Sequence, residues 1–382
     1  MLKTDKAALA AAISAVIGVV SRTAKVPIMQ NICIEEEAGE LVMRGSSMDI
    51  EIASRVDVAF EDGFEPFTLP AHLLEDAVRR MPDGAEIVIQ RVNDASGRMA
   101  SVNIRSGRSR LKLPVLPASD FPKLDAGKLP HQISLDGSML ARRIKAVLPA
   151  VCTDLTRHFI AGVLLHPTED GLRIVATDGK RLAVRLIPAI EIDQSEILSG
   201  IPKATVPTRV IERALKVMGG QEDVTIDLSS QKIRVAAGRT VLVGKLVEGV
   251  FPDYAHILPS ASACRLSFSS AALQAAISRV LVVTPDAGNG VEFSAAEDRM
   301  TINAREMTIG DADDEIACES EAPVKGGFHG IQMRESLETT EADQVECLVS
   351  LDGAPMLLRA PGDEANYTIL LPMQPKYARA QA

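Results

Sequence analysis

The sequence has few of the residues that enzymes depend on. Only 3% of its 382 residues are aromatic and none is tryptophan, so the hydrophobic cores must be built from aliphatic side chains. The six histidines lie far apart, and no nucleophile, acid–base pair or metal set is clustered as an active site requires. The one dense carboxylate cluster, Asp311 to Glu315, lacks the context of a Ca²⁺ site. We interpret it as a solvated acidic loop, and we expect no catalysis, no cofactor and no metal.

Long apolar runs and paired cysteines are also missing. No stretch approaches the roughly 18 apolar residues of a membrane helix. The first 22 residues could pass for a signal peptide, but Leu9, Ile13 and Val16 repeat at helical spacing and no cleavage site follows. We therefore expect a mature helix with Thr4 as its N-cap. The cysteines form no CxxC pair, which is typical of reduced thiols in the cytoplasm; they are Cys33, Cys152, Cys264, Cys318 and Cys347.

The net charge of −10 is unevenly distributed. Residues 260–382 contain 9 Lys+Arg and 19 Asp+Glu, and they account for the whole excess. The first 259 residues hold 32 of each sign. Basic faces that bind nucleic acid are therefore possible in the first two thirds of the chain, despite its acidic total.

Similar stretches recur along the chain at a spacing of about 130 residues. Apolar residues at i, i+4, i+7 and i+8 begin at Leu9, Leu140 and Leu273, each predicting a helix. A second helix type recurs between them, because TLPAHLLEDAVRRM at 68–81 matches TVPTRVIERALKVM at 205–218. The segments between the helices alternate and are rich in β-branched residues, as antiparallel strands are. We predict an α+β protein of three units, each with two helices covering a sheet.

The stretch VATDGKRLAV, residues 175–184, looks like the end of a phosphate-binding loop. The upstream glycines of such a loop are missing, Arg181 stands where Ser or Thr is needed, and the chain continues as a strand rather than a helix. The pattern therefore predicts a tight hairpin turn and not a nucleotide site.

Five separated stretches resemble one family: SGRSRLKLPVLPASDFPKL, RHFIAGVLL, VATDGKRLAV, KLVEGVFPDY and LLPM. Over nearly its whole length the chain is similar to bacterial sliding clamps, the β subunits of the replicative DNA polymerase. The resemblance implies three tandem clamp domains at 1–127, 128–259 and 260–382, each with two helix-plus-antiparallel-sheet halves. It also implies a head-to-tail dimeric ring around duplex DNA: a processivity factor, not an enzyme, whose partners are the polymerase, the clamp loader and other proteins with clamp-binding peptides.

The resemblance places the helices on the inside of the ring, against double-stranded DNA. In the stretch ARRIKAVL every charge is positive, and no base-reading element is present, so we expect sequence-independent, salt-sensitive binding. The third domain offers little beyond Arg279 and Arg334 and should hold DNA less firmly. The predicted DNA contacts are Arg22, Lys25, Arg79, Arg142, Arg143, Lys145, Arg157, His158, Phe159, Arg209, Arg213 and Lys216.

The family also has a hydrophobic pocket between the second and third domains that receives short peptides of partner proteins. In this interpretation the TDGKRL turn shapes a protein-docking groove, with Leu182 presenting an apolar side chain. The predicted wall consists of Ile160, Thr177, Gly179, Lys180, Arg181, Leu182, Pro252, His256, Ile257, Ile369, Leu370, Leu371, Pro372 and Met373.

The resemblance places the dimer joint at Leu111 and Leu113 of one chain and Val282 and Val283 of the other. We expect these apolar residues to be exposed near an edge strand in a single chain.

Two features depart from the family. Gln332 stands where an aromatic residue is usual, and the second helix of the third unit is expected to be poorly formed. The chain also continues beyond Met373 with Gln374, Pro375 and a further tail. An accessory clamp paralogue, or a protein scaffold that does not load on DNA, therefore remains an alternative to the main clamp.

Overall fold

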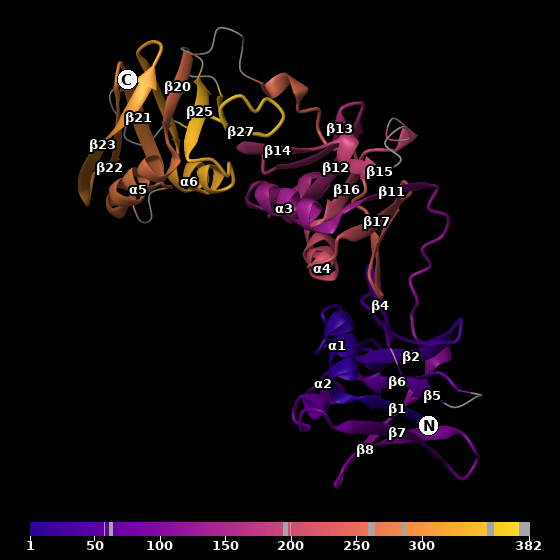
Figure 1. Cartoon of the computed structure of the whole chain (residues 1–382). Coiled ribbons are helices and arrows are strands. Elements are labelled where there is room, and N and C mark those ends of the chain that lie inside the picture. Colours follow the sequence, from indigo (N-terminus) through magenta and orange to yellow (C-terminus); the bar gives the residue numbers. More distant parts are fainter. Residues whose placement is uncertain are drawn as a thin grey trace. The chain divides into compact units, whose positions relative to one another are not determined.

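The computed structural model describes residues 1–56, 58–60, 64–193, 198, 200–258, 264–284, 288–349 and 355–373. These residues contain six α-helices in three pairs, as the repeats predict. The first members are α1 (Lys6–Ile17), α3 (Gly137–Val147) and α5 (Ser270–Val280), and the second members are α2 (Ala71–Arg79), α4 (Thr208–Met218) and α6 (Gly330–Glu338). Helices α1 and α2 lie side by side, as do α5 and α6 (Figure 1). In the described part of the chain no helix is long and apolar enough to cross a membrane.

The chain folds into two compact units. One comprises Met1–Ala141, Glu191–Pro202 and Arg209–Leu246, and the other comprises Arg142–Ile190, Lys203–Thr208 and Val247–Ala382. The second repeat therefore contributes to both units, so the physical units do not coincide with the sequence repeats.

The first unit contains two antiparallel sheets. The smaller has the order β5-β1-β7-β8-β9, and the larger has the order β10-β6-β2-β3-β4-β19-β18-β17-β11-β15. Strand β4 of the first repeat pairs with β19 of the second, with Ala53 opposite Val241. The strands are β1 (Leu2–Asp5), β2 (Asn31–Glu37), β3 (Glu40–Ser46), β4 (Ile50–Val56), β5 (Ala59–Phe60), β6 (Phe67–Pro70), β7 (Glu86–Asn93), β8 (Met99–Ser106), β9 (Ser109–Pro114), β10 (Leu116–Pro117), β11 (His131–Asp136), β15 (Ile192–Asp193), β17 (Asp223–Leu228), β18 (Lys232–Ala237) and β19 (Thr240–Lys245).

The second unit contains one long antiparallel sheet with the order β16-β12-β13-β14-β27-β26-β25-β20-β23-β22-β21-β24. Here β14 of the second repeat pairs with β27 of the third, with Leu182 opposite Ile369. The strands are β12 (Gly162–Thr168), β13 (Gly171–Thr177), β14 (Arg181–Pro188), β16 (Ala204–Pro207), β20 (Cys264–Ser269), β21 (Gly290–Ala296), β22 (Arg299–Glu306), β23 (Gly310–Ser320), β24 (Val324–His329), β25 (Gln344–Val349), β26 (Met356–Arg359) and β27 (Tyr367–Leu370).

Helix α1 does not begin at Thr4, and that prediction is wrong. The N-cap is Asp5, whose carboxylate accepts the N–H of Ala8 at 2.8 Å. Thr4 lies in β1 opposite Ile87 of β7. This pairing keeps the backbone extended up to Asp5, and so it fixes where the helix starts.

Helix α6 is well formed, contrary to expectation. The ring nitrogen Nδ1 of His329 accepts the N–H of Gln332 at 3.4 Å and caps the helix. Met333 and Leu337 are buried in the core of the third repeat. Glu335 and Glu338 lie on its other positions, so burial of one apolar face decides the outcome.

The acidic segment Asp311 to Glu315 is part of strand β23 and not a loop. It pairs residue for residue with β22, for example Asp313 with Asn303. Its side chains alternate between exposed positions and positions facing the third-repeat core, where Ile316 is buried. The period of two, rather than the charge, determines the structure.

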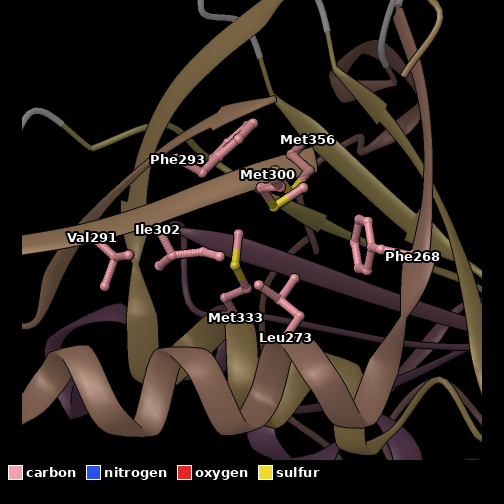
Figure 2. A pocket seen from close by; sticks show the side chains of 8 residues that line it. All are labelled: Phe268, Leu273, Val291, Phe293, Met300, Ile302, Met333 and Met356. Carbon is pink, nitrogen blue, oxygen red and sulfur yellow. The ribbon is translucent and has the colours of Figure 1, made fainter. Parts of the chain in front are cut away.

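The core of the third repeat encloses a small apolar cavity of about 10 Å³. Leu273 of α5 and Met333 of α6 face Met300, Ile302 and other side chains of the sheet around it (Figure 2). Such a cavity has room for about one water molecule but offers it no polar partner, so it is expected to stay dry.

Substituting Met333→Ala should lower the stability of the third domain by about 2–5 kcal/mol, because it enlarges a cavity whose walls are held by the sheet. Scanning calorimetry should show the transition of this domain at a lower temperature. Met333→Leu conserves volume and should cost less than about 1.5 kcal/mol. Equal transitions for wild type and Met333→Ala would contradict the packing described here.

Candidate functional site

The TDGKRL segment is confirmed as a hairpin turn between β13 and β14. The carboxylate of Asp178 accepts the N–H groups of Lys180 at 2.8 Å and Arg181 at 3.0 Å. Gly179 has a φ of +84°, and a Cβ at this position would lie 2.8 Å from Nη1 of Arg157. Glycine is needed here both for the backbone conformation and for the close approach of that guanidinium.

Two arginines hold the turn from either side. Arg157 donates from Nη1 to the carbonyl oxygen of Asp178 at 2.8 Å. Arg181 is buried and donates from Nη1 to Oε2 of Glu335 in α6 at 2.6 Å, and from Nη2 to the carbonyl of Pro149. Its positive charge is thus neutralised within the protein. The predicted wall residue Arg181 ties the turn to the third repeat rather than offering a free charge to a ligand.

Gln332, which stands where the family usually has an aromatic residue, also takes part in the contact between the turn and α6. Its amide nitrogen Nε2 donates to Oδ2 of Asp178 at 3.3 Å. A polar residue therefore links α6 to the turn.

Burial, together with the nearby charges of Lys180 and Arg181, lowers the pKa of His329, the residue that caps α6, below its usual value. Sequence analysis did not identify Asp178 or Glu335, because their contacts with Gln332 and Arg181 join residues that are 154 positions apart in the chain.

A hydrophobic cluster lies under the turn and brings several predicted wall residues together. Ile160, Leu182 and Ile369 are buried in it, and Ile257 packs against it from a half-buried position. Leu182 is only 2% exposed, so it forms part of the floor beneath the predicted groove. The pairing of β14 with β27 turns Leu182 inward, opposite Ile369. Phe251 and Tyr254, which the sequence analysis did not select, complete the cluster.

The segment Leu371 to Met373 is fastened at both ends. Leu371 donates its N–H to the carbonyl of Lys180 at 2.8 Å, and Met373 donates to the carbonyl of Gly327 at 2.7 Å. Leu371 and Pro372 are exposed. The predicted wall residues Thr177 and Met373 are half-buried, whereas Pro252 and His256 are exposed. Gln374, Pro375 and the rest of the tail lie outside the described residues.

Tyr254 in the cluster receives polar support from β12. Its hydroxyl lies 2.6 Å from Nδ1 of His166. Burial, with the nearby charges of Lys203 and Arg173, lowers the pKa of His166 to about 4. The imidazole is therefore neutral at physiological pH, and it keeps the tyrosine ring oriented against the apolar side chains.

The junction between β14 and β27 also contains a buried cation that the sequence analysis missed. Arg185 donates to the carbonyls of Val184 and Tyr367, each at 2.8 Å, and to that of Thr339 at 2.9 Å. Burial, with the neighbouring Arg143, lowers its pKa to about 10, so it stays charged at neutral pH. Carbonyl oxygens thus replace a carboxylate as its partners.

The cationic side chains predicted to contact DNA differ in their exposure and in whether a carboxylate pairs with them. Arg142 and Lys145 of α3 are exposed, as are Arg209 and Lys216 of α4, and the described residues place no carboxylate within ion-pair distance of these four. Arg143 is half-buried, and its Nε has no hydrogen-bond partner among them.

The cations of the first repeat are partly neutralised. Arg22 lies 3.6 Å from Glu75, and Arg79 lies 2.6 Å from Asp76. Lys25 is exposed.

Three predicted DNA contacts serve structural roles instead of being fully exposed. Arg213 is half-buried, and its Nη1 would lie 2.8 Å from a Cβ at Gly18, at the end of α1. In the 3₁₀ segment Leu155–Ile160, Arg157 supports the turn and Phe159 packs against the apolar cluster. His158 is the exposed member of that group. In the third repeat Arg279 pairs with Asp314, and Arg334 lies 3.7 Å from Glu338.

The four predicted joint residues are not equally exposed. Leu113 is 4% exposed and buried within its own domain, so its expected exposure is wrong. It lies opposite Val102 of β8, which directs it into the core. Leu111 and Val283 are half-buried, and Val282, in the 3₁₀ segment Leu281–Val283, is 75% exposed.

Three family models match the chain in order. They describe the DNA polymerase III beta subunit: its N-terminal domain at residues 1–125, its central domain at 134–253 and its C-terminal domain at 255–374. The chain belongs to the bacterial β sliding clamp family. It is a processivity clamp of the replicative DNA polymerase, built from three tandem clamp domains, and this favours the clamp over the scaffold alternative.

Curated relatives and solved structures agree with this assignment. The beta sliding clamp of Caulobacter vibrioides is 32% identical over 381 residues, covering 98% of this chain and 99% of that one. The Escherichia coli K12 clamp is 29% identical over 354 residues, covering 91% and 92%. A Caulobacter crescentus clamp structure matches with a TM-score of 0.89 at 31% identity, covering 98% of both chains. The Bartonella birtlesii clamp, solved with griselimycin bound, matches with a TM-score of 0.87 at 28% identity, covering 98% and 99%.

The clamp should lose stability as the pH falls from about 6.5 towards about 4. In this window the unfolded chain protonates His166 at its ordinary pKa, while the folded chain, with its pKa lowered to about 4, does not. The unfolding temperature measured at pH 7.5 and pH 5 should therefore differ more for wild type than for His166→Gln. An identical pH dependence in both would show that His166 titrates normally.

Proposed function

We propose that two copies of this clamp close head to tail into a ring around duplex DNA, and that it acts by binding and not by catalysis. The three clamp domains are assigned to 1–127, 128–259 and 260–382, and the second boundary falls outside the described residues. All five cysteines are free and buried, which suits work in the reducing cytoplasm where DNA is replicated.

The peptide site of this clamp is assigned to the apolar cluster beneath the TDGKRL turn. The observation that carries this proposal is that Ile257 packs half-buried against the cluster, while the exposed Pro252 and Leu371 closely follow its buried members Phe251 and Ile369 in the chain. Two apolar peptide side chains buried there would contribute roughly 3–6 kcal/mol. Ordering the peptide costs much of that, so micromolar affinity is expected. The occupants are the replicative polymerase, the clamp loader and other proteins with clamp-binding motifs.

The DNA face is assigned mainly to the second domain. Arg142, Lys145, Arg209 and Lys216 carry charges that no carboxylate of the described residues neutralises. Phosphate binding by such side chains is independent of sequence, which a sliding ring requires. The first domain contributes Lys25 to this DNA face, together with Arg22 and Arg79, whose charges nearby carboxylates neutralise in part. The arginines of the third domain are paired with carboxylates and contribute little to DNA binding.

The dimer joint is assigned to two strand edges of opposite charge. Strand β9 pairs only with β8 in the described sheet, and its Arg110 and Lys112 are exposed. Residues 310–317 of β23 pair only with β22 among the described strands, and Asp313 and Glu315 project outward, with Glu315 also 3.8 Å from Arg299 of β22. Free edges tend to add a strand from another chain, and the opposite charges select this pairing over like with like.

Peptide binding tests the first assignment. A labelled peptide with a Gln-Leu-x-Leu-Phe motif should bind Leu371→Asp at least about 10-fold more weakly than wild type, since a carboxylate then has to be desolvated beside the cluster. Ile190→Asp changes an equally apolar but more exposed position outside the cluster and should bind normally. Equal affinities for Leu371→Asp and wild type in a fluorescence titration would place the peptide site elsewhere.

Salt dependence tests the DNA face. Neutralising Arg142, Lys145, Arg209 and Lys216 to glutamine should reduce the slope of log K against log salt by about 0.9 for each phosphate that the variant no longer neutralises. Neutralising Arg279 and Arg334 is the matched control, because carboxylates already pair with both. Binding to a DNA duplex, measured by anisotropy at several salt concentrations, should separate the two variants. An unchanged slope in the fourfold variant would mean that these helices do not face DNA.

A further inference from the structure

The hairpin between β22 and β23 ends in two exposed apolar side chains. Met307 is 81% exposed and Ile309 is 57% exposed, and both lie at the tip immediately before the acidic residues of β23. Large apolar side chains gathered at one exposed point favour contact with another surface. Residues 307–309 are named the apolar tip below.

The first domain contains a groove of about 520 Å³ at the end of β9. Its apolar lining comes from Phe67, Met99, Val115, Leu116 and Pro117, and its polar lining includes Arg98 and the ion pair of Arg91 with Glu65. This volume lies in the range of sites that bury ligand groups. Val115 follows β9 directly and leads into β10 of the larger sheet, so the groove lies where the chain leaves the free edge of β9.

The relative direction of the free edges of β9 and β23 decides whether the apolar tip of one copy comes near the groove of the other. In an antiparallel pairing between copies, Lys112 can lie opposite Asp313 and Arg110 opposite Glu315, with all four on exposed positions of their strands. The same register, continued beyond the ends of β9 and β23, brings Ile309 towards Val115 and Leu116 at the groove. A parallel pairing would instead bring the tip to the turn between β8 and β9. Charge matching and apolar matching are satisfied together only in the antiparallel arrangement.

We propose that the apolar tip of one copy docks into the first-domain groove of a second copy, next to the paired edges of β9 and β23. This inference rests on the proposed head-to-tail ring and adds an apolar anchor to its charged joint. The charges direct the encounter of the two edges, and removal of the tip from water slows the opening of the joint.

A dilution series in sedimentation velocity tests the anchor. Wild type should be a dimer, and the double variant Met307→Ser with Ile309→Ser should dissociate at least about 10-fold more readily. Ile190→Ser removes a comparably exposed apolar side chain elsewhere and should leave the dissociation constant unchanged. If wild type is a dimer and the dissociation constant of the double variant is within threefold of the wild-type value, the docked tip is overturned but the ring is not. Monomeric wild type would overturn the ring itself.

Crosslinking provides a test that does not depend on stability. Native thiols should not interfere, because all five are buried and burial raises the pKa of Cys33 to about 12 and that of Cys318 to about 11. Met307→Cys combined with Ser119→Cys should give a covalent dimer when diamide oxidises the two thiols. Met307→Cys combined with Thr23→Cys, an exposed position outside the groove, should not. Equal yields from the two pairs would overturn the proposed docking.

Discussion

The pairing of β14 with β27 is the constraint on which the proposed peptide site depends. It places the turn of the second repeat beside the last strand of the third, with Leu182 opposite Ile369. Arg185 reinforces the junction with hydrogen bonds to carbonyls on both sides, and Arg181 adds an ion pair to α6. Because one continuous sheet carries both walls, the apolar cluster is preformed. A peptide bound at the proposed site would meet an ordered surface and lose little affinity to reorganisation of the protein.

Carboxylates determine which of the many arginines are available. Where Asp or Glu lies alongside, as for Arg279 and Arg334, the positive charge is already neutralised, and for Arg79 it is neutralised in part. Where the described residues place none, as for Arg142 and Lys145, the charge is free to meet phosphate. The net charge of −10 is therefore a poor guide to DNA binding. Pairing at each position matters more than the total.

Periodic features were predictable from the sequence, and features that depend on distant partners were not. The three-fold repeat, the six helix positions and the TDGKRL hairpin follow from local spacing and turn chemistry. Thr4 failed as a cap because β7, about 80 residues away, holds it in a strand. The acidic segment of β23 was mispredicted because its pairing with β22 outweighs its charge. At the site, the positions of Ile160, Ile257 and Ile369 were found by resemblance, whereas Asp178, Glu335 and Arg185 act through contacts that no local pattern reveals.

The two long sheets each join strands from neighbouring repeats, through β4 with β19 and β14 with β27. The boundaries of the sequence repeats and the boundaries of the folded units therefore lie at different places in the chain. A single repeat, cut out at its sequence boundaries, would have an unpaired strand at each sheet edge where a neighbouring repeat normally pairs. It would fold well only beside a neighbour that supplies a matching strand. A strand at one of these seams can therefore be altered without loss of pairing only if its partner strand in the neighbouring repeat still matches it.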